Sequence, residues 1–504
     1  MKYLSAAWKE DKLWGGVLIS WYLTVFSSFF ESYLFRIALP IGGYFFLFRG
    51  VLPLTVILFA VWCIRRKKNP FAELTTFEKA FLLLVVVMLL YGAGSFFFAI
   101  SRSAWLSKYL IIGSYLIFAL LFVLLGKDSS VRWTTLLLAC GTMLICTIGG
   151  LIEVYHGCFF DVPAADYRSY YFMRQWLQIP IFTFYNTNGF CTSNFWMLLI
   201  AWMLLFEGWA DLSQQRQRIA LWFLTALTCL SVFLYAVSKG RLTIFSLPFL
   251  FVGIAVWLLI RYKRGLWIFA AFTCFFLFIY VGENYDQITA YATYAKEYIQ
   301  AIKVAPPAEP ETPAESETPA EPVLPVKPEP PVIEPNRHST MSTLVPVDSE
   351  TGQVSISSDE SGRIRLHLLQ SSMEVLLASK GLGVGVGNGG IRIGIHDGSN
   401  GAPDIHCFIM EVFLEFGFFA MVPLLLLLSI LLKSWFLRIR HARREGDLNL
   451  LSNTLFQIFA VMTYPFLSTA NASSWGVAAM WLFLGYILLE NSEKEKTLRI
   501  SLQQ

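Results

Sequence analysis

Long apolar runs recur along this chain and are separated by short polar segments. A helix of about 20 residues crosses the hydrocarbon core of a bilayer, and most of the runs approach that length. One of them, residues 33–64, also contains two arginines and two prolines, so it is either one broken span or two short passages. The pattern predicts an all-α transmembrane bundle of about twelve spans, near residues 14–31, 33–64, 79–100, 108–126, 133–153, 183–206, 218–237, 242–260, 266–281, 407–432, 453–470 and 474–490.

One long polar segment, residues 282–405, interrupts this pattern. Its stretch 305–335 holds eleven of the 21 prolines together with seven glutamates, a composition typical of a disordered or polyproline-II spacer. Residues 363–378 then predict an amphipathic helix, because apolar side chains recur there at three- and four-residue spacing (Leu366, Leu369, Met373, Leu376 and Leu377). The chain thus divides into residues 1–281 with about nine spans, the loop 282–405, and residues 406–504 with about three spans and a cytoplasmic tail.

The distribution of basic residues predicts the orientation of the bundle. Lysine and arginine are enriched in short cytoplasmic loops. If Arg65–Lys68 is cytoplasmic, alternation along the chain also places the basic segments 216–218, 261–264, 433–444 and 494–499 in the cytoplasm. Both termini are then cytoplasmic. The loop 282–405, the loop 154–182 and the turn 238–241 lie on the outer face.

Composition supports a membrane protein and excludes several other classes. Hydrophobic residues make up 56% of the chain and charged residues only 15%, well below the quarter that is usual in soluble domains. The formal charge of +4 is small, and we expect no nucleic-acid partner. The eight cysteines form no CxxC pair and lie mostly in apolar runs, so neither a disulfide framework nor a metal site is indicated. We expect a multi-pass protein of the cytoplasmic membrane without a cleaved signal peptide.

A glycine-rich run, Gly381–Gly387, follows the predicted amphipathic helix. Glycine at alternate positions favours a tight turn whose backbone amides are free to approach a ligand. The run does not lie between a strand and a helix, so a dinucleotide-binding fold is not indicated.

Ionisable residues gather at the predicted outer face. Arg241 begins a span, Arg363 begins the amphipathic helix, and His406 precedes the next span. Two guanidinium groups and an imidazole at a membrane edge suit a lipid that carries phosphate esters. The alternative for Lys239 and Arg241 is that they anchor a helix end by reaching toward the lipid headgroups.

In their order along the chain, these segments resemble the O-antigen ligase/polymerase superfamily. The resemblance rests on Phe184–Phe190 with Asn186 and Asn188, Ser238–Arg241, Ser361–Arg363, the Gly381–Gly387 run, and His406, Met410, Glu415 and Gly417. The chain departs from the family pattern at Thr187, Gly240 and Cys407. Lys239 competes with Arg241 for one family arginine, and we favour Arg241 because of its spacing from Ser238; Arg365 competes with Arg363 for the other.

The resemblance implies a metal-independent, inverting glycosyltransferase without a cofactor. Such an enzyme transfers a glycan from an undecaprenyl-diphosphate donor to an acceptor saccharide at the outer face of the membrane. The family pattern implies His406 as the general base, or as the group that orients the acceptor hydroxyl. It implies Arg241 and Arg363, with Lys239 and Arg365 as competitors, as ligands of the diphosphate, and it places Glu415, Gly417, Asn186 and Asn188 in supporting positions.

Other readings stay open. Within the superfamily, a polymerase differs from a ligase by having two sizeable outer loops, and a protein-glycosylating relative is a further option. A flippase or transporter of lipid-linked oligosaccharides would instead show internal repeats and polar residues at the middle of the membrane. On a continuous helix, Glu415 faces away from His406, whereas Glu411 and Glu415 share a face.

Overall fold

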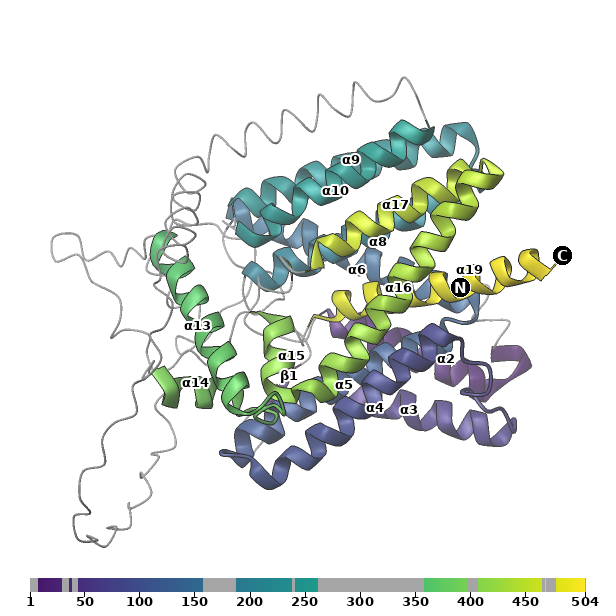
Figure 1. Ribbon diagram of the computed structural model, residues 1–504. Helices are drawn as coiled ribbons and strands as arrows, with labels where there is room; N and C mark the ends of the chain where they lie inside the picture. Colours follow the sequence, from purple (N-terminus) through teal and green to yellow (C-terminus); the bar gives the residue numbers. More distant parts are fainter. Residues whose placement is uncertain are drawn as a thin grey trace, which may run out of the picture. The chain divides into compact units, whose positions relative to one another are not determined.

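The structure is a computed structural model that describes residues 8–29, 36–38, 44–156, 187–237, 241–261, 358–397, 407–464, 467 and 477–503. The chain divides into two compact units, one formed by Met1–Thr273 with Leu368–Gln504 and the other by Cys274–His367. Almost every described residue belongs to the first unit, whose helices can be followed in Figure 1.

The regular secondary structure of the described residues is helical apart from one short hairpin, in agreement with the predicted helical bundle. Its strands, β1 (Arg36–Ala38) and β2 (Tyr44–Phe46), are antiparallel, with Ile37 opposite Phe45. The helices are α2 (Lys12–Ser28), α3 (Leu47–Arg65), α4 (Thr76–Gly94), α5 (Arg102–Leu125), α6 (Ser129–His156), α8 (Thr187–Glu207), α9 (Gln214–Val237), α10 (Arg241–Arg261), α13 (Ser358–Ala378), α14 (Gly389–Asp397), α15 (Phe408–Phe416), α16 (Phe418–Glu445), α17 (Leu448–Met462) and α19 (Ala478–Gln503), with the 3-10 turns η1 (Ser95–Phe98) and η2 (Gly208–Asp211).

Seven helices in the described part of the chain are long and apolar enough to cross a membrane. They are Leu47–Arg65, Thr76–Phe98, Arg102–Leu125, Ser129–Glu153, Gly189–Asp211, Gln214–Ala236 and Phe418–Glu445. This number indicates a polytopic membrane protein. The total of about twelve spans stays a prediction, and the apolar run 266–281 lies outside the described residues.

Helix α8 is the most enclosed of these helices. Its apolar window is 94% buried, against at most 50% in the other six. It contacts α6, α9, α17 and α19, and Figure 1 shows it among these helices. Two of its tryptophans, Trp196 and Trp202, are fully buried. Helix α8 therefore lies at the centre of the bundle, and each of the other six helices leaves at least half of its apolar window unburied.

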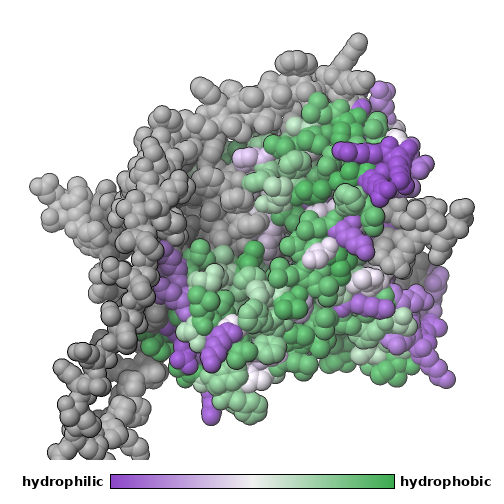
Figure 2. Space-filling view, viewed as in Figure 1, coloured by the Kyte–Doolittle hydropathy of each residue, from purple (hydrophilic) through white to green (hydrophobic). Residues whose placement is uncertain are grey.

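The outward faces of these helices are apolar. Figure 2 shows an apolar surface over α16 and α4, with hydrophilic residues gathered toward both ends. Large exposed side chains on α16 include Val422, Leu425, Leu432 and Phe436. Because a water-soluble bundle would turn polar side chains outward, this surface is suited to lipid hydrocarbon.

Local sequence signals define where several helices begin. Thr75 and Glu78 form a capping box at the start of α4, in which each side chain bonds to the backbone of the other residue. Ser101 caps α5 by accepting from the Ala104 N–H, and Asp11 caps α2 by accepting from the Leu13 and Trp14 N–H groups. These caps satisfy amides that would otherwise lie unpaired at the membrane edge.

Two of the predicted apolar runs are not continuous helices, and a break is expected in only one of them, residues 33–64. In the run 33–64, Arg36–Ala38 and Tyr44–Phe46 are strands and the helix begins only at Leu47. The run 407–432 is not one helix either, because α15 ends at Phe416 and α16 begins at Phe418. Between them Gly417 has φ 58° and ψ −146°, a conformation open essentially to glycine alone. Hydrophobicity is continuous across this position, so the apolar pattern conceals the break.

Candidate functional site

A lysine and two glutamates meet at the end of the bundle where α15 begins. The ammonium Nζ of Lys108 on α5 lies 2.5 Å from Oε1 of Glu411 and 2.8 Å from Oε1 of Glu415, both on α15. We call these three residues the Lys108 cluster. Glu415 is fully buried and Lys108 keeps 20% of its side chain exposed. As predicted, Glu411 and Glu415 share one face of their helix, since both reach the same ammonium group.

The charges of the Lys108 cluster do not balance. One ammonium group can neutralise one carboxylate, so the cluster either carries a negative charge or holds a proton. Oε2 of Glu415 is buried and has no hydrogen-bond partner among the described residues. Buried charge without full compensation is costly in a protein interior. Such an arrangement is common where a protein binds a ligand or handles a proton.

The glycine-rich run is joined to the end of α15 by backbone hydrogen bonds. The Val384 N–H donates to the Leu414 carbonyl at 2.8 Å, and the Gly385 N–H donates to the Glu415 carbonyl at 2.9 Å. The Gly387 N–H donates to Oε1 of Glu415 at 3.1 Å. The run therefore satisfies the last carbonyls of α15 and one carboxylate oxygen of the Lys108 cluster.

Glycine is required where this run meets the break between α15 and α16. A Cβ atom on Gly417 would lie 2.3 Å from the Gly381 carbonyl oxygen and 2.4 Å from the Gly383 nitrogen. A Cβ atom on Gly383, which has φ 83°, would lie 2.6 Å from the Gly417 nitrogen. The two backbone segments thus approach more closely than any side chain would allow.

The prediction that the amides of this run are free for a ligand is wrong for most of them. Those of Val384, Gly385 and Gly387 bond to α15, and the Val386 N–H donates to Oγ of Ser95 at 3.2 Å. The Asn388 N–H donates to the Gly385 carbonyl. The run is a structural connection between helices, because the neighbouring helix ends take up its donors.

The same run is bonded to the connection between α4 and α5. Asn388 is almost fully buried, and its Oδ1 accepts from the Ile100 N–H at 2.9 Å while its Nδ2 donates to the Val384 carbonyl at 2.7 Å. The Tyr91 hydroxyl donates to the Leu382 carbonyl at 2.9 Å. Segments that are almost 300 residues apart in sequence are thereby fixed around the Lys108 cluster.

The structure describes only part of the site predicted from the sequence. Glu415 lies in the Lys108 cluster, and Gly417 forms the break between the helices. His406, Lys239 and Asn186 lie outside the described residues.

Four further predicted residues are described by their backbone alone. Arg241 is the first residue of α10, Asn188 lies in the first turn of α8, and Arg363 and Arg365 lie in α13. Their side chains lie outside the described part of the chain. The convergence of His406 with the arginines therefore stays a prediction.

Lys108 was missed in the sequence, although a signal for it exists. It is the one charged residue between Arg102 and Lys127, in a stretch otherwise suited to the membrane. An isolated charge near the end of a span marks a functional or structural contact by default. The sequence gives no indication of its partners, because Glu411 lies about 300 residues further along.

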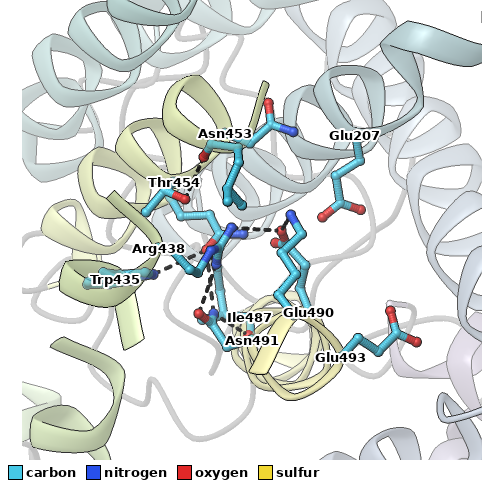
Figure 3. A network of polar contacts seen from close by, with 12 residues as sticks. Glu207, Trp435, Arg438, Asn453, Thr454, Ile487, Glu490, Asn491 and Glu493 are labelled. Carbon is cyan, nitrogen blue, oxygen red and sulfur yellow. Dashed lines mark hydrogen bonds and ion pairs between the residues drawn. The ribbon is translucent and has the colours of Figure 1, made fainter. Parts of the chain in front are cut away.

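A second polar cluster lies at the other end of the bundle, and we call it the Arg438 cluster (Figure 3). The guanidinium of Arg438 on α16 is fully buried and donates to Oε1 of Gln457 at 3.0 Å and to Oδ1 of Asn491 at 2.9 Å. It also lies 3.3 Å from Oε1 of Glu490. Lys494 forms a second ion pair with Glu490.

Helix α8 joins the Arg438 cluster through Glu207. The Tyr486 hydroxyl on α19 donates to Oε2 of Glu207, while Oε1 of Glu207 is buried without a hydrogen-bond partner among the described residues. The cluster thus ties α8, α16, α17 and α19 together. Charged groups in such a setting are stable only when paired, so these four helices fix one another's positions.

Helix α4 shows that the two clusters lie at opposite ends of the bundle. Tyr91, near its C-terminus, bonds to Leu382 beside the Lys108 cluster. Thr75, just before its N-terminus, bonds to Ser492 on α19, next to the Arg438 cluster. The described side chains include no group of three His, Cys, Asp or Glu residues placed to hold a metal ion.

Comparisons of the chain with protein-family models, with curated proteins and with solved structures give no match.

Proposed function

We propose that the protein transfers a glycan from an undecaprenyl-diphosphate donor to an acceptor saccharide at the membrane surface. The support is the order of the sequence motifs together with one structural observation. The two segments that carry the resemblance most fully, the glycine-rich run and the α15 segment, fold into one hydrogen-bonded unit. Gly387 and Glu415 are in direct contact within it. His406 is the second residue before α15 in the sequence, and its own placement lies outside the described residues.

In this proposal the chemistry needs positioning and charge neutralisation more than a cofactor. The diphosphate is already a leaving group, and guanidinium forks from Arg241 and Arg363 would bind its oxygens. His406 would take the proton of the acceptor hydroxyl as that oxygen attacks the anomeric carbon.

A transporter is the less favoured reading because of where the buried charges lie. Transport sites are expected near the middle of the membrane, between repeated halves. Arg438 lies 20 residues after Phe418 on one helix, about 30 Å away, and the Lys108 cluster lies at the near end of that helix. The described charges thus gather at the two ends of the bundle. A polymerase of the same superfamily would use the same site with a growing glycan as acceptor.

The proposal is tested by transfer from purified undecaprenyl-diphosphate glycan to an acceptor in proteoliposomes. We expect His406→Ala to lower the rate by roughly 100- to 10,000-fold while the protein still inserts. His441→Ala, on α16 near the Arg438 cluster, is the matched control and should keep its activity. Near-normal turnover by His406→Ala would overturn the catalytic assignment.

Two further arms of this assay separate the alternatives. Arg241→Ala and Arg363→Ala should be severely impaired and Arg→Lys only partly restored, because an ammonium group cannot form the bidentate phosphate contact. Activity that survives EDTA supports the metal-independent mechanism. Products that lengthen by successive repeats indicate a polymerase, whereas one glycan joined to a lipid-linked core indicates a ligase.

A further inference from the structure

Helix α13 presents three different faces along its described side chains. Leu368, Ser371 and Ser372 are buried against the first unit, and Leu368 packs in a core with Ile393 and Met410. A second face carries Leu369, Met373 and Leu377, which are all exposed. The predicted apolar residues of this helix whose side chains are described therefore divide between this exposed face and Leu376, which packs against the core.

The exposed apolar face is narrow and continuous. At about 100° per residue, three residues spaced by four lie within about 80° of one another around the helix axis. Gln370 and Glu374, on the next sector, are also exposed. The helix is thus packed on one side, apolar on a second and polar on a third. This is the pattern of a helix that lies in a membrane interface.

The apolar face leads directly into the lipid-facing surface of the bundle. Five residues after Leu377, and past the end of α13, the chain reaches Leu382, which is 55% exposed. Gly381 lies against the ring of Phe418, because a Cβ atom there would be 2.1 Å from that ring. Phe418 begins α16, and its exposed ring and that of Phe419 continue as the apolar outer face of that span.

Charged residues border this surface where lipid headgroups would lie. Lys380 lies two residues after the end of α13 and Arg392 lies on α14, and both are exposed. Basic side chains at such positions can contact lipid phosphates while apolar neighbours enter the hydrocarbon.

We infer that the exposed face of α13 formed by Leu369, Met373 and Leu377 is inserted among the acyl chains of the membrane leaflet next to the Lys108 cluster. The inference does not depend on glycan transfer. It places the end of the predicted polar loop in the membrane interface, and it makes the bilayer itself the partner of this surface.

Photochemical cross-linking to lipid tests this inference in the full-length protein. Benzoyl-phenylalanine is incorporated singly at positions 369, 373 and 377, and at the control positions 370 and 374. Each variant is reconstituted into vesicles of phosphatidylethanolamine and phosphatidylglycerol, irradiated and analysed by mass spectrometry of the intact protein. We expect phospholipid adducts to form at positions 369, 373 and 377 with several-fold higher yield than at positions 370 and 374.

Equal yields at the two sets of positions would overturn the inference, as would the absence of lipid adducts from the apolar set. Adducts between two copies of the chain at positions 369, 373 and 377 would also overturn it and would identify a dimer interface instead. Three positions on one face keep the test decisive if one variant fails to insert.

Discussion

The Gly387 N–H donates to Oε1 of Glu415 at 3.1 Å, and the same oxygen lies 2.8 Å from the ammonium group of Lys108. One carboxylate oxygen therefore joins the glycine-rich run, α15 and α5. The relationship explains why a charged residue can be fully buried at this position. Its cost is offset by an ion pair and a backbone donor, both of which come from distant parts of the chain.

Lys108→Met should be strongly destabilising, because it leaves Glu411 and Glu415 buried without a cation. Removal of one partner from a buried ion pair costs about 3–5 kcal/mol. Adding Glu411→Gln and Glu415→Gln to Lys108→Met should recover much of that loss. Thermal unfolding in detergent micelles measures both effects. If Lys108→Met unfolds at the wild-type temperature, the cluster does not stabilise the fold. If the triple variant unfolds no higher than Lys108→Met, the uncompensated carboxylates are not the cause of the loss.

Gly417→Ala should also destabilise the protein, because a Cβ atom there would lie 2.3 Å from a backbone oxygen. A residue forced into this conformation costs on the order of 1–3 kcal/mol before the clash is counted. Gly446→Ala is the matched control, since Gly446 also has positive φ (67°) but has open space around a Cβ atom. We expect the unfolding temperature to fall much further for Gly417→Ala. Equal shifts would mean that the clash is relieved by movement of the backbone.

Arg438→Met tests the Arg438 cluster. The substitution leaves Glu490 its ion pair with Lys494. It leaves Gln457 and Asn491 with longer hydrogen bonds, from Trp435 and from Ser434, both at 3.2 Å. We expect a loss of about 3–5 kcal/mol in stability, as for other broken buried pairs. The double variant Arg438→Met/Glu490→Gln should be more stable than Arg438→Met. The resistance of each variant to proteolysis in vesicles measures this order of stability. A double variant that is no better would show that the hydrogen bonds matter more than the charges.

Asp11 should make stability depend on pH in the acidic range. Its side chain accepts from Arg66 at 2.7 and 2.9 Å, and this contact holds the pKa of the Asp11 carboxyl below its usual value of 3.8. A depressed pKa stabilises the fold above the ordinary pKa, and the contribution is lost as the pH falls through the lowered value. The ion pair is largely solvent-exposed at Arg66, so we expect its contribution to stay below about 1 kcal/mol.

Two substitutions separate the roles of Asp11. Asp11→Asn should keep the helix cap and remove the acid-dependent contribution, whereas Asp11→Ala should remove both and cost about 1 kcal/mol more. In unfolding midpoints measured from about pH 2 to about pH 7, both variants should lack the acid-dependent contribution of Asp11, and the curve of Asp11→Ala should lie below that of Asp11→Asn throughout. A wild-type curve that is already flat would argue against the ion pair.

The sequence predicts that the chain contains several membrane-length apolar helices, because burial in lipid demands long apolar runs, whereas the total of about twelve spans stays a prediction. The helix α13 and the shared face of Glu411 and Glu415 also follow from local spacing. The break at Gly417 does not, since phenylalanines on both sides continue the apolar pattern. The hydrogen-bond acceptors of the amides in the glycine-rich run also cannot be predicted from the sequence, because tertiary structure alone brings α15 beside them.

The carboxylate partners of the buried basic residues likewise could not be predicted from the sequence. Lys108 and Arg438 are each visible as charges near the ends of apolar runs, but their carboxylates lie on helices far away in sequence. Periodicity describes what one helix presents to its surroundings, and it says nothing of which neighbour lies opposite. The same holds for α13, because an apolar stripe can face lipid as well as protein and its spacing does not decide which.

Helix α16 runs without interruption from Phe418, beside the Gly417 break, to Arg438 and on to Glu445. Contacts therefore fix this helix near both of its ends. The length of helix between Phe418 and Arg438 is close to the thickness of a bilayer's hydrocarbon core. In a thinner bilayer the helix would have to tilt, which would strain the backbone at Gly417 beside Glu415. In a thicker bilayer the lipid would have to thin locally around the Arg438 end. We therefore expect the conformation of the protein to depend on the length of the lipid acyl chains, and we expect the change to be largest around the carboxylates of α15.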